Sequence, residues 1–293
     1  MKPAPFTYHA PRTIDETLTL LAELPEAKVM AGGQSFVPVL NMRLASPQHL
    51  IDINHVEGLD TVAVTDQGVT IGALVRHAEL EHHDGAYAAI PLLRQAVSRV
   101  AHPAIRNRGT TVGSIAHADP SGEMPAILAL CDGTLTARSA CGERTIKAAD
   151  FFVGPMESTL EHDELVTDAT FARFAPGTRT AYDELARRSG DYAVVGVAVA
   201  VTVEDDTITA ARASFVSVTD APDVLDLSGM LTGHPATAPD EQTAAQLAQA
   251  VAEHVDPVDD IHASAEYRRE VASILTRRVL TTALAHTPEG AHR

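Results

Sequence analysis

The segment VMAGGQSFVPVLNMRL, residues 29–44, places two adjacent glycines between an apolar stretch and a stretch with helical spacing. Gly32 and Gly33 allow a positive φ and let another group approach the backbone where a Cβ would intrude. A helix that follows directly, with Ser35 as its cap and Pro38 in its first turn, presents unpaired amides and a partial positive charge. The segment lacks the P-loop lysine and the GxGxxG spacing. Taken alone, it favours an ordinary strand-to-helix turn over a phosphate site.

A second segment, RNRGTTVGS at residues 106–114, repeats the combination of glycines with small hydroxyl residues. Gly109 and Gly113 flank two threonines and a serine, and Arg106 and Arg108 stand beside them. Two such loops in one chain predict a long ligand whose diphosphate is held from both sides. A dinucleotide fits that description.

The remaining pattern mixes short strands with helices and predicts an α+β fold. The capping box of Thr13 and Glu16 starts a helix over residues 13–24, and further helices are expected over 87–101, from about residue 123, and over 240–255 and 264–285. Residues 28–31, 49–53 and 68–75 are expected to be strands, and 191–206 with 207–220 form a predicted antiparallel hairpin. Pro176 and Gly177 mark a linker, so a domain boundary is expected near residue 177.

Composition excludes several classes of function. The formal charge of −17 argues against nucleic-acid binding, which needs a basic surface. No apolar run reaches the length of a membrane-spanning helix, and the N-terminus lacks the apolar region of a secretory signal, so a cytoplasmic location is expected. Cys131 and Cys141 are too few for a disulfide framework or a CxxC metal site. No metal ligands are therefore assigned, and any iron–sulfur cluster must belong to another chain.

The segment IAHADPSGEMP, residues 115–125, is open to two interpretations. His117, Asp119 and Glu123 are candidates for proton transfer. Alternatively, Asp119 and Ser121 cap the helix that begins near Glu123, and His117 lines a pocket. The two interpretations are balanced for Asp119, and the second is favoured for His117. No nucleophile with a neighbouring base is evident elsewhere in the sequence.

Five motifs, in order along nearly the whole chain, resemble one known family. They are AGGQSFVPVLNMRLASPQHLIDI, IRNRGTTVGSIAHADPSGEMPA, FFVGP, SGDYAVVGVAV and AEYRREVASILTRR. Together they are similar to the FAD-binding medium subunit of molybdenum hydroxylases of the carbon monoxide dehydrogenase and xanthine dehydrogenase type.

The resemblance implies a fold and a set of cofactor contacts. Residues 1–177 would form a two-subdomain FAD-binding domain of the vanillyl-alcohol-oxidase (PCMH) type, with subdomains of about 1–56 and 57–177. Residues 178–293 would form a C-terminal domain of a small antiparallel sheet and helices. The two loops would bind the FAD diphosphate, Glu123 the ribityl chain, the backbone of Leu165 and Val166 the ring edge, and Tyr192 the ring face. The loop positions are Ala31, Gly32, Gly33, Gln34, Ser35, Thr110, Thr111, Val112, Gly113 and Ser114.

The resemblance also implies an oxidoreductase subunit without catalytic side chains of its own. It would take electrons from iron–sulfur clusters and pass them through FAD to an external acceptor. Its partners would be a large molybdenum-cofactor subunit and a small two-iron iron–sulfur subunit, assembled as a dimer of heterotrimers. A stand-alone FAD oxidase or dehydrogenase, with His117 or Asp119 as base, and a flavin-free scaffold protein are the alternatives.

Two positions depart from the family pattern. Val112 stands where the first of two paired glycines is usual, which raises the question of room for the phosphate. Glu184, two residues after Tyr182, stands where many relatives carry a lysine, so any tuning of the flavin by that cation does not carry over. The sequence names neither the oxidised substrate nor the electron acceptor.

Overall fold

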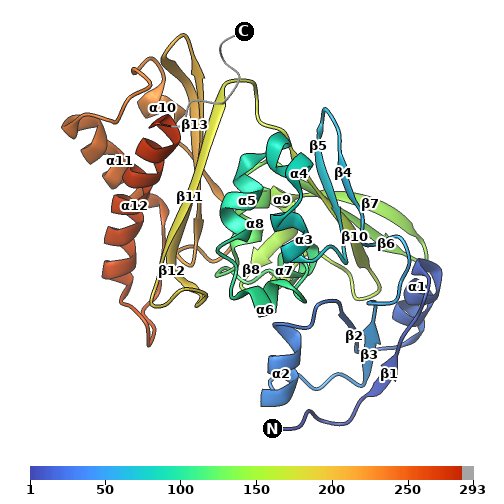
Figure 1. The fold of residues 1–293 in the computed structure, drawn as a ribbon. Helices are drawn as coiled ribbons and strands as arrows, with labels where there is room; N and C mark the ends of the chain where they lie inside the picture. Colours follow the sequence, from blue (N-terminus) through green and yellow to red (C-terminus); the bar gives the residue numbers. More distant parts are fainter. Residues whose placement is uncertain (286–293) are drawn as a thin grey trace.

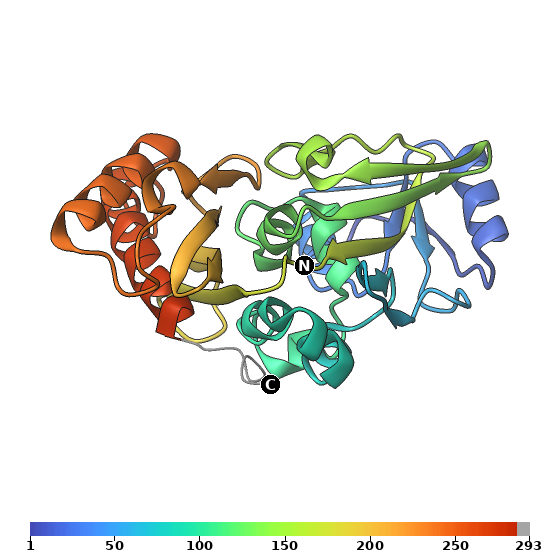
Figure 2. The ribbon, with the colours of Figure 1, turned by 90° about the horizontal axis from the view of Figure 1, so that it is seen from above.

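The computed structural model describes residues 1–285, which form an α+β fold of two lobes side by side (Figure 1). The N-terminal lobe, residues 1–172, holds two larger sheets and a two-stranded ribbon, and the C-terminal lobe, residues 178–285, holds a third larger sheet. Seen from above, the lobes meet along helices that lie between their sheets (Figure 2). None of the helices in residues 1–285 combines the length and apolar character needed to cross a membrane.

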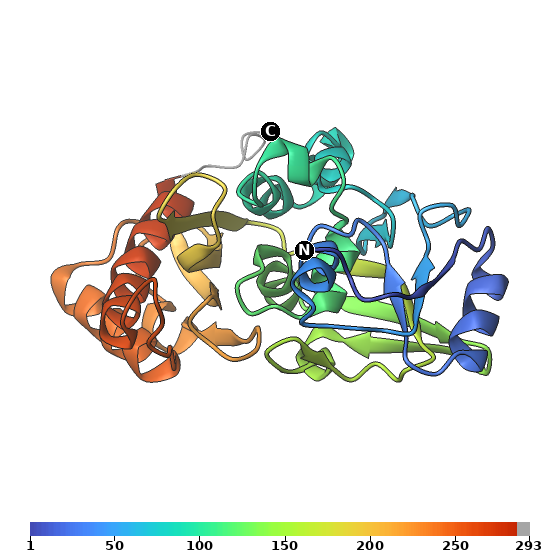
Figure 3. The ribbon, with the colours of Figure 1, turned by 90° about the horizontal axis from the view of Figure 1, so that it is seen from below.

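The first sheet is a small parallel one with the strand order β1-β3-β2. Its first helix begins as expected, because the Thr13 hydroxyl accepts the Glu16 amide at 3.1 Å and the Glu16 carboxylate accepts the Thr13 amide at 3.3 Å. The elements are β1 (Thr7–His9), α1 (Ile14–Glu23), β2 (Ala27–Met30), α2 (Phe36–Met42) and β3 (His49–Asp52). In the view from below, this sheet lies on the side of the N-terminal lobe that faces the viewer, with α1 at the outer edge (Figure 3).

The second sheet is antiparallel, with the order β4-β5-β10-β6-β7, and helices cover it on the side of the C-terminal lobe. Its strands are β4 (Val62–Val64), β5 (Gly68–Gly72), β6 (Thr134–Ser139), β7 (Gly142–Lys147) and β10 (Leu165–Ala172). The other elements of this part are α3 (His77–Glu81), α4 (Asp84–Ala89), α5 (Pro91–Val97), α6 (Pro103–Arg106), α7 (Thr111–His117), α8 (Glu123–Leu130), α9 (Ala148–Phe151), β8 (Phe152–Gly154) and β9 (Glu157–Ser158).

One helix prediction in this part is wrong. The single helix expected over residues 87–101 is divided into α4 and α5 at Ile90, which ends one helix and caps the next. Pro91 causes the division, because proline lacks an amide hydrogen and pushes the residue before it out of the helical region.

The third sheet is antiparallel, and its two faces are both covered. Helices α11 and α12 lie on the outer face, and α5 and α8 of the N-terminal lobe lie on the other (Figure 1). This explains why β12 is buried along almost its whole length. Asp205 and Asp206, both with positive φ, make the tight turn of the expected β12–β13 hairpin. The elements are β11 (Thr178–Ala186), β12 (Ala193–Glu204), β13 (Thr207–Val216), β14 (Val224–Asp226), α10 (Ser228–Leu231), α11 (Glu241–His254) and α12 (Ala265–Ala285).

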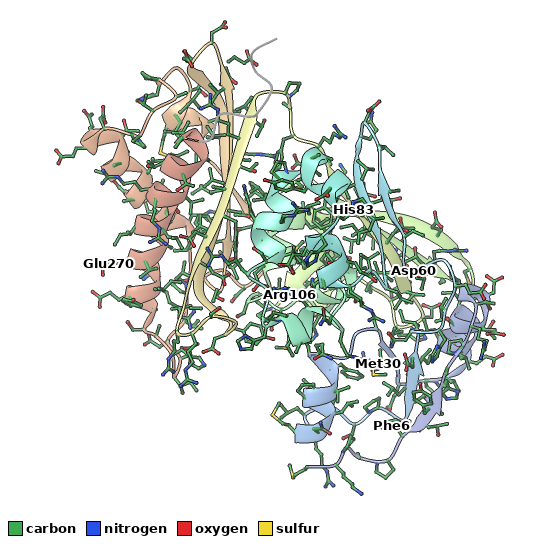
Figure 4. All side chains as sticks on the ribbon, in the orientation of Figure 1. Phe6, Met30, Asp60, His83, Arg106 and Glu270 are labelled. Carbon is green, nitrogen blue, oxygen red and sulfur yellow. The ribbon has the colours of Figure 1, made fainter. Side chains whose placement is uncertain are left out.

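Polar contacts join the lobes across this interface. The Ser214 hydroxyl donates to the Ala126 carbonyl at 2.9 Å, and the Arg212 guanidinium reaches the Asp132 carboxylate at 2.7 Å and the Leu130 carbonyl at 3.0 Å. Glu270 points outward from α12 on the far side of the sheet (Figure 4). The C-terminal helix therefore closes the outer face of its sheet, while the inner face holds the N-terminal lobe.

Candidate functional site

The first glycine loop connects β2 to α2 and leaves its backbone amides unpaired. Among residues 1–285, the amides of Gly32, Gly33, Gln34 and Ser35 have no hydrogen-bond partner. Gly33 has φ 72°, which favours glycine, and Gly32 is buried. Four successive amides without acceptors form a cradle for an anion.

The capping role expected of Ser35 is met in position but not in hydrogen bonding. Ser35 is the N-cap residue of α2, yet its side chain makes no hydrogen bond to the amides of that helix. Its hydroxyl instead lies near the phenol of Tyr192 in the C-terminal lobe.

The second glycine loop lies directly against the first. A Cβ placed on Gly32 would come 2.3 Å from the Arg108 carbonyl oxygen and 2.7 Å from the Gly109 Cα. A Cβ placed on Gly113 would lie 3.7 Å from the Ala31 side chain. The backbones of residues 31–35 and 108–114 are therefore neighbours, as the diphosphate hypothesis requires, and only glycine fits at position 32.

The second loop opens α7 with a side-chain cap. The Thr110 hydroxyl accepts the Gly113 amide at 3.1 Å, and the Thr111 amide donates to the Val75 carbonyl at 3.2 Å. The Val112 amide has no partner within the described part of the chain, residues 1–285. It is therefore the amide that this loop offers to a ligand.

Val112 itself does not obstruct the loop. Its side chain is 1% exposed and belongs to the hydrophobic core of the N-terminal lobe. The residue lies within α7 and has no positive φ. A glycine is not needed at this position, because the branched side chain points away from the space between the loops.

Two side chains that the sequence reasoning missed brace the loops against each other. Asn54 donates to the Ala31 carbonyl at 2.7 Å and accepts from the Arg76 guanidinium at 2.6 Å. Arg76 also donates to the Arg108 carbonyl at 2.7 Å. The chain Ala31–Asn54–Arg76–Arg108 thus ties one loop to the other. The sequence contained a signal for this role, because Asn54 and Arg76 are polar residues that directly follow two predicted strands, next to turns.

The imidazole of His77 lies beneath the second loop and was also missed. Its Nδ1 is 3.2 Å from the Thr111 hydroxyl, and its side chain is 3% exposed. Burial, with the nearby Arg106 charge, lowers the pKa of His77 to about 4. His77 is therefore neutral at pH 7 and supports the loop through hydrogen bonding rather than charge.

Arg106 is not available to bind a phosphate. It forms an ion pair with Glu81 at 2.8 Å and donates to the carbonyls of Val100 and Ala101 at 3.0 and 2.9 Å. Figure 4 shows it among the helices of the N-terminal lobe. Its guanidinium holds the α5–α6 connection together.

Glu123 opens α8 in a buried environment, with 6% exposure. Burial, together with the Glu184 and Asp119 charges, raises the pKa of Glu123 to about 8. The capping interpretation of this segment is wrong, because Gly122 is the N-cap and makes no side-chain bond. Asp119 instead accepts the Ser121 amide at 2.9 Å and shapes the turn before the helix.

The departure at Glu184 is accommodated by a hydrogen bond. The Tyr182 hydroxyl donates to the Glu184 carboxylate at 2.6 Å, in a part of β11 that faces the N-terminal lobe. Burial raises the pKa of Glu184, and it raises the pKa of Tyr182 well above its usual value. Glu123 also acts on Tyr182 through its charge, so these three groups form one buried acidic cluster.

Tyr192 extends from the C-terminal lobe to the first glycine loop. Desolvation and the Asp119 charge raise the pKa of its phenol, and the nearby Ser35 hydroxyl opposes this rise. The side chain is nevertheless 63% exposed. A large part of its ring is free to cover a ligand.

Leu165 and Val166 begin β10 with side chains that are 4% and 5% exposed. Both side chains belong to the core, and a register shift follows Val166. Only their backbone is available to contact a ligand.

His117 ends α7 and is half-buried. Within residues 1–285, no group of three or more His, Cys, Asp or Glu side chains is arranged so that it could hold a metal ion.

Comparisons with known proteins agree with this arrangement. Residues 4–171 match the family model "FAD binding domain in molybdopterin dehydrogenase", and residues 180–283 match "CO dehydrogenase flavoprotein C-terminal domain". The chain is 36% identical to 6-hydroxypseudooxynicotine dehydrogenase complex subunit alpha of Paenarthrobacter nicotinovorans, over 97% of this chain and 96% of that one. It is 35% identical to the carbon monoxide dehydrogenase medium chain of Hydrogenophaga pseudoflava, over 97% and 99%.

Solved structures give the same result. A chain of carbon monoxide dehydrogenase from Hydrogenophaga pseudoflava, in a form that lacks the Mo-pyranopterin moiety of its cofactor, superposes with a TM-score of 0.90 at 33% identity. The superposition covers 97% of this chain and 99% of that chain.

Proposed function

Because the chain belongs to the family of FAD-binding medium subunits of molybdenum hydroxylases, we propose that it holds FAD with the diphosphate between its two glycine loops. The family resemblance and the α+β fold inferred from the sequence are confirmed. The observation that carries the proposal is the run of four unpaired amides at residues 32–35, set directly against the second loop. A dianionic diphosphate supplies the acceptors that these amides lack.

The same proposal assigns the remaining contacts. Glu123, at the start of α8, would hydrogen-bond the ribityl chain, and Tyr192 would cover the ring from the C-terminal lobe. The backbone at Leu165 and Val166 would meet the ring edge. Residues 1–177 would then act as the FAD-binding domain, with subdomains of about 1–56 and 57–177, and residues 178–293 as the domain that completes the ring site.

Bound FAD supplies the redox chemistry, since a flavin exchanges electrons singly or in pairs. The residues of this chain bind and orient it. The loops would hold the diphosphate, Asn54 and Arg76 keep the loops at a set spacing, and Tyr192 would limit solvent access to one side of the ring. We therefore infer an oxidoreductase subunit that needs no catalytic side chain of its own.

Other chains must supply the electrons. Cys131 is buried and Cys141 exposed, and residues 1–285 contain no clustered metal ligands, so an iron–sulfur cluster has no ligand set in that part of the chain. Relatives are named as the medium chain or a complex subunit of dehydrogenases. We infer that this chain works with a large molybdenum-cofactor subunit and a small two-iron iron–sulfur subunit, as a dimer of heterotrimers in the cytoplasm.

The test is co-expression of the chain with its two expected partners, followed by purification through a tag on this chain. Stoichiometric FAD, molybdenum and iron in one complex are expected. The Gly33→Val variant, whose side chain would meet Val37 and Met30 at a positive φ, should lose FAD, whereas Gly229→Ala, at an open position, should keep it. A lone yellow protein that turns over a substrate would identify a stand-alone flavoenzyme instead, and a colourless one would identify a scaffold.

A further inference from the structure

The ring of Tyr192 extends into open space, so its neighbours do not fix it by packing. Its side chain is 63% exposed, and it borders a cavity of 690 Å³ that Ser217 and Arg268 also line. Its phenol lies near the Ser35 hydroxyl of the other lobe. The position of the ring therefore depends on the backbone that carries it.

Ser217 ties that backbone to the other lobe through hydrogen bonds. Ser217 directly follows β13, and its amide donates to the Pro120 carbonyl at 2.9 Å. Its hydroxyl donates to the Ala193 carbonyl at 2.7 Å, one residue after Tyr192. One serine thus joins the turn that precedes α8 to the segment that presents the aromatic ring.

Ser217 adopts a conformation that its side chain does not favour. Its φ is 66°, in the left-handed region, where residues other than glycine, asparagine and aspartate are uncommon. Such a conformation persists where the surroundings over-determine it. Here the amide, hydroxyl and carbonyl of Ser217 form hydrogen bonds with three different segments of the chain, and these bonds hold the unfavourable conformation in place.

Arg268 of α12 supplies the third contact and secures the junction. Its guanidinium is buried and donates to the carbonyls of Val194 at 2.6 Å and Ser217 at 3.3 Å. It also forms an ion pair with Asp260 at 2.6 Å. Desolvation acts to raise the pKa of Asp260. Hydrogen bonds from the amides of Ala263 and His262 and from Arg268 outweigh it and lower the pKa of Asp260 to about 2. The ion pair therefore stays charged at neutral pH.

We propose that Ser217 and Arg268 are positioning residues that set how Tyr192 lies against the flavin, by binding the backbone on its C-terminal side to the turn at Pro120. This inference rests on the proposed placement of the flavin against Tyr192. Ser217 and Arg268 both belong to the C-terminal lobe, outside the two glycine loops. From the sequence, Arg268 was expected only to lie in the helix over residues 264–285.

Flavin fluorescence tests the proposal, because a tyrosine ring in contact with an excited flavin quenches it by electron transfer. The chain contains no tryptophan, so Tyr192 has no indole competitor within it. The protein used is the full chain loaded with FAD, and FAD content is measured beside the fluorescence lifetime. Tyr192→Leu defines the unquenched limit.

Ser217→Ala removes the hydroxyl bond to Ala193 and keeps the backbone contacts. The equilibrium between Tyr192 rings held against the flavin and rings turned away from it should shift about fivefold toward the second state, because one ordinary hydrogen bond is lost. The mean lifetime of flavin fluorescence should lengthen, while the FAD content stays stoichiometric. Arg268→Gln should have the same effect. Ser273→Ala is the matched control, since that hydroxyl also donates to backbone carbonyls, Ala248 and Arg269 at 3.0 and 3.2 Å, away from the junction.

The outcomes separate the two proposals. If Tyr192→Leu lengthens the lifetime and Ser217→Ala and Arg268→Gln leave it at the wild-type value, the positioning role is overturned and the flavin site stands. If Tyr192→Leu changes nothing, the placement of the flavin against Tyr192 is overturned. Loss of FAD from Ser217→Ala, with FAD retained by Tyr192→Leu, overturns the positioning role in favour of a structural one.

Discussion

The contact between the two glycine loops predicts a specific defect for Gly32→Ala. The new Cβ would lie 2.3 Å from the Arg108 carbonyl oxygen and 2.7 Å from the Gly109 Cα. Because carbon makes its best contacts at about 3.5 to 4 Å, the loops would have to part by about 1 Å. Both obstructing atoms belong to backbone, and Arg76 holds that backbone at 2.7 Å, so no side-chain rotation relieves the clash.

Overpacking of this kind costs roughly 1 to 3 kcal/mol. Because the strain distorts the loops that bind the diphosphate, we expect FAD binding to weaken by about 5- to 150-fold. Titration of the flavin-free chain with FAD, followed by quenching of flavin fluorescence, measures this directly. Gly229→Ala is the control, because nothing lies within 4 Å of a Cβ at that position. Wild-type FAD affinity in Gly32→Ala would refute the idea that the closeness of the loops makes the site.

Three further substitutions test the surroundings of the loops. Asn54→Ala leaves the Ala31 carbonyl and the Arg76 guanidinium without their shared partner, so urea unfolding should show a loss of about 1 to 3 kcal/mol, and Asn54→Asp, which sets a second carboxylate against Asp52 and the Ala31 carbonyl, should lose at least as much at pH 7. Glu123 has its pKa raised from 4.5 to about 8, so its own contribution to the free energy of unfolding should be fully present below pH 4.5 and be lost, by at most about 5 kcal/mol, as the pH rises to 8. Urea unfolding of Glu123→Gln across this range should lack that decline, and an unchanged slope would contradict the assignment. Val112→Gly, which restores the usual family residue, should lower stability by roughly 3 kcal/mol through loss of a buried side chain in a helix, yet keep FAD affinity near wild type; weaker FAD binding without loss of stability would contradict its place in the core.

Local elements were predictable where a short stretch of sequence contains both the signal and its partner. The capping box of Thr13 and Glu16 starts α1 as expected, and the hairpin of β12 and β13 forms around the polar turn at Asp205 and Asp206. The error over residues 87–101 was also local, because Pro91 already contained the reason for a break. The apolar periodicity of residues 87–101 predicts one continuous helix, whereas the proline predicts the break that the structure shows.

Predictions failed where a side chain has its partner in a distant segment. Ser35 is the N-cap residue of α2 as expected, but its hydroxyl lies near Tyr192 of the other lobe and makes no hydrogen bond to the helix amides. Val112 raised a question about the phosphate only because the direction of its side chain into the core was unknown. Asn54, Arg76 and His77 drew no attention, since each acts on a loop well separated from it in sequence.

The sequence by itself determined the glycine positions, the α+β pattern and the family, because motifs in a fixed order restrict the fold even without coordinates. Only the tertiary structure decided that the amides of residues 32–35 lack partners, that the loops touch at Gly32, and that Ser217 joins the two lobes beneath Tyr192. The physical reason is that unpaired donors and close backbone approaches depend on distances between remote segments. Spacing along the chain contains no record of those distances.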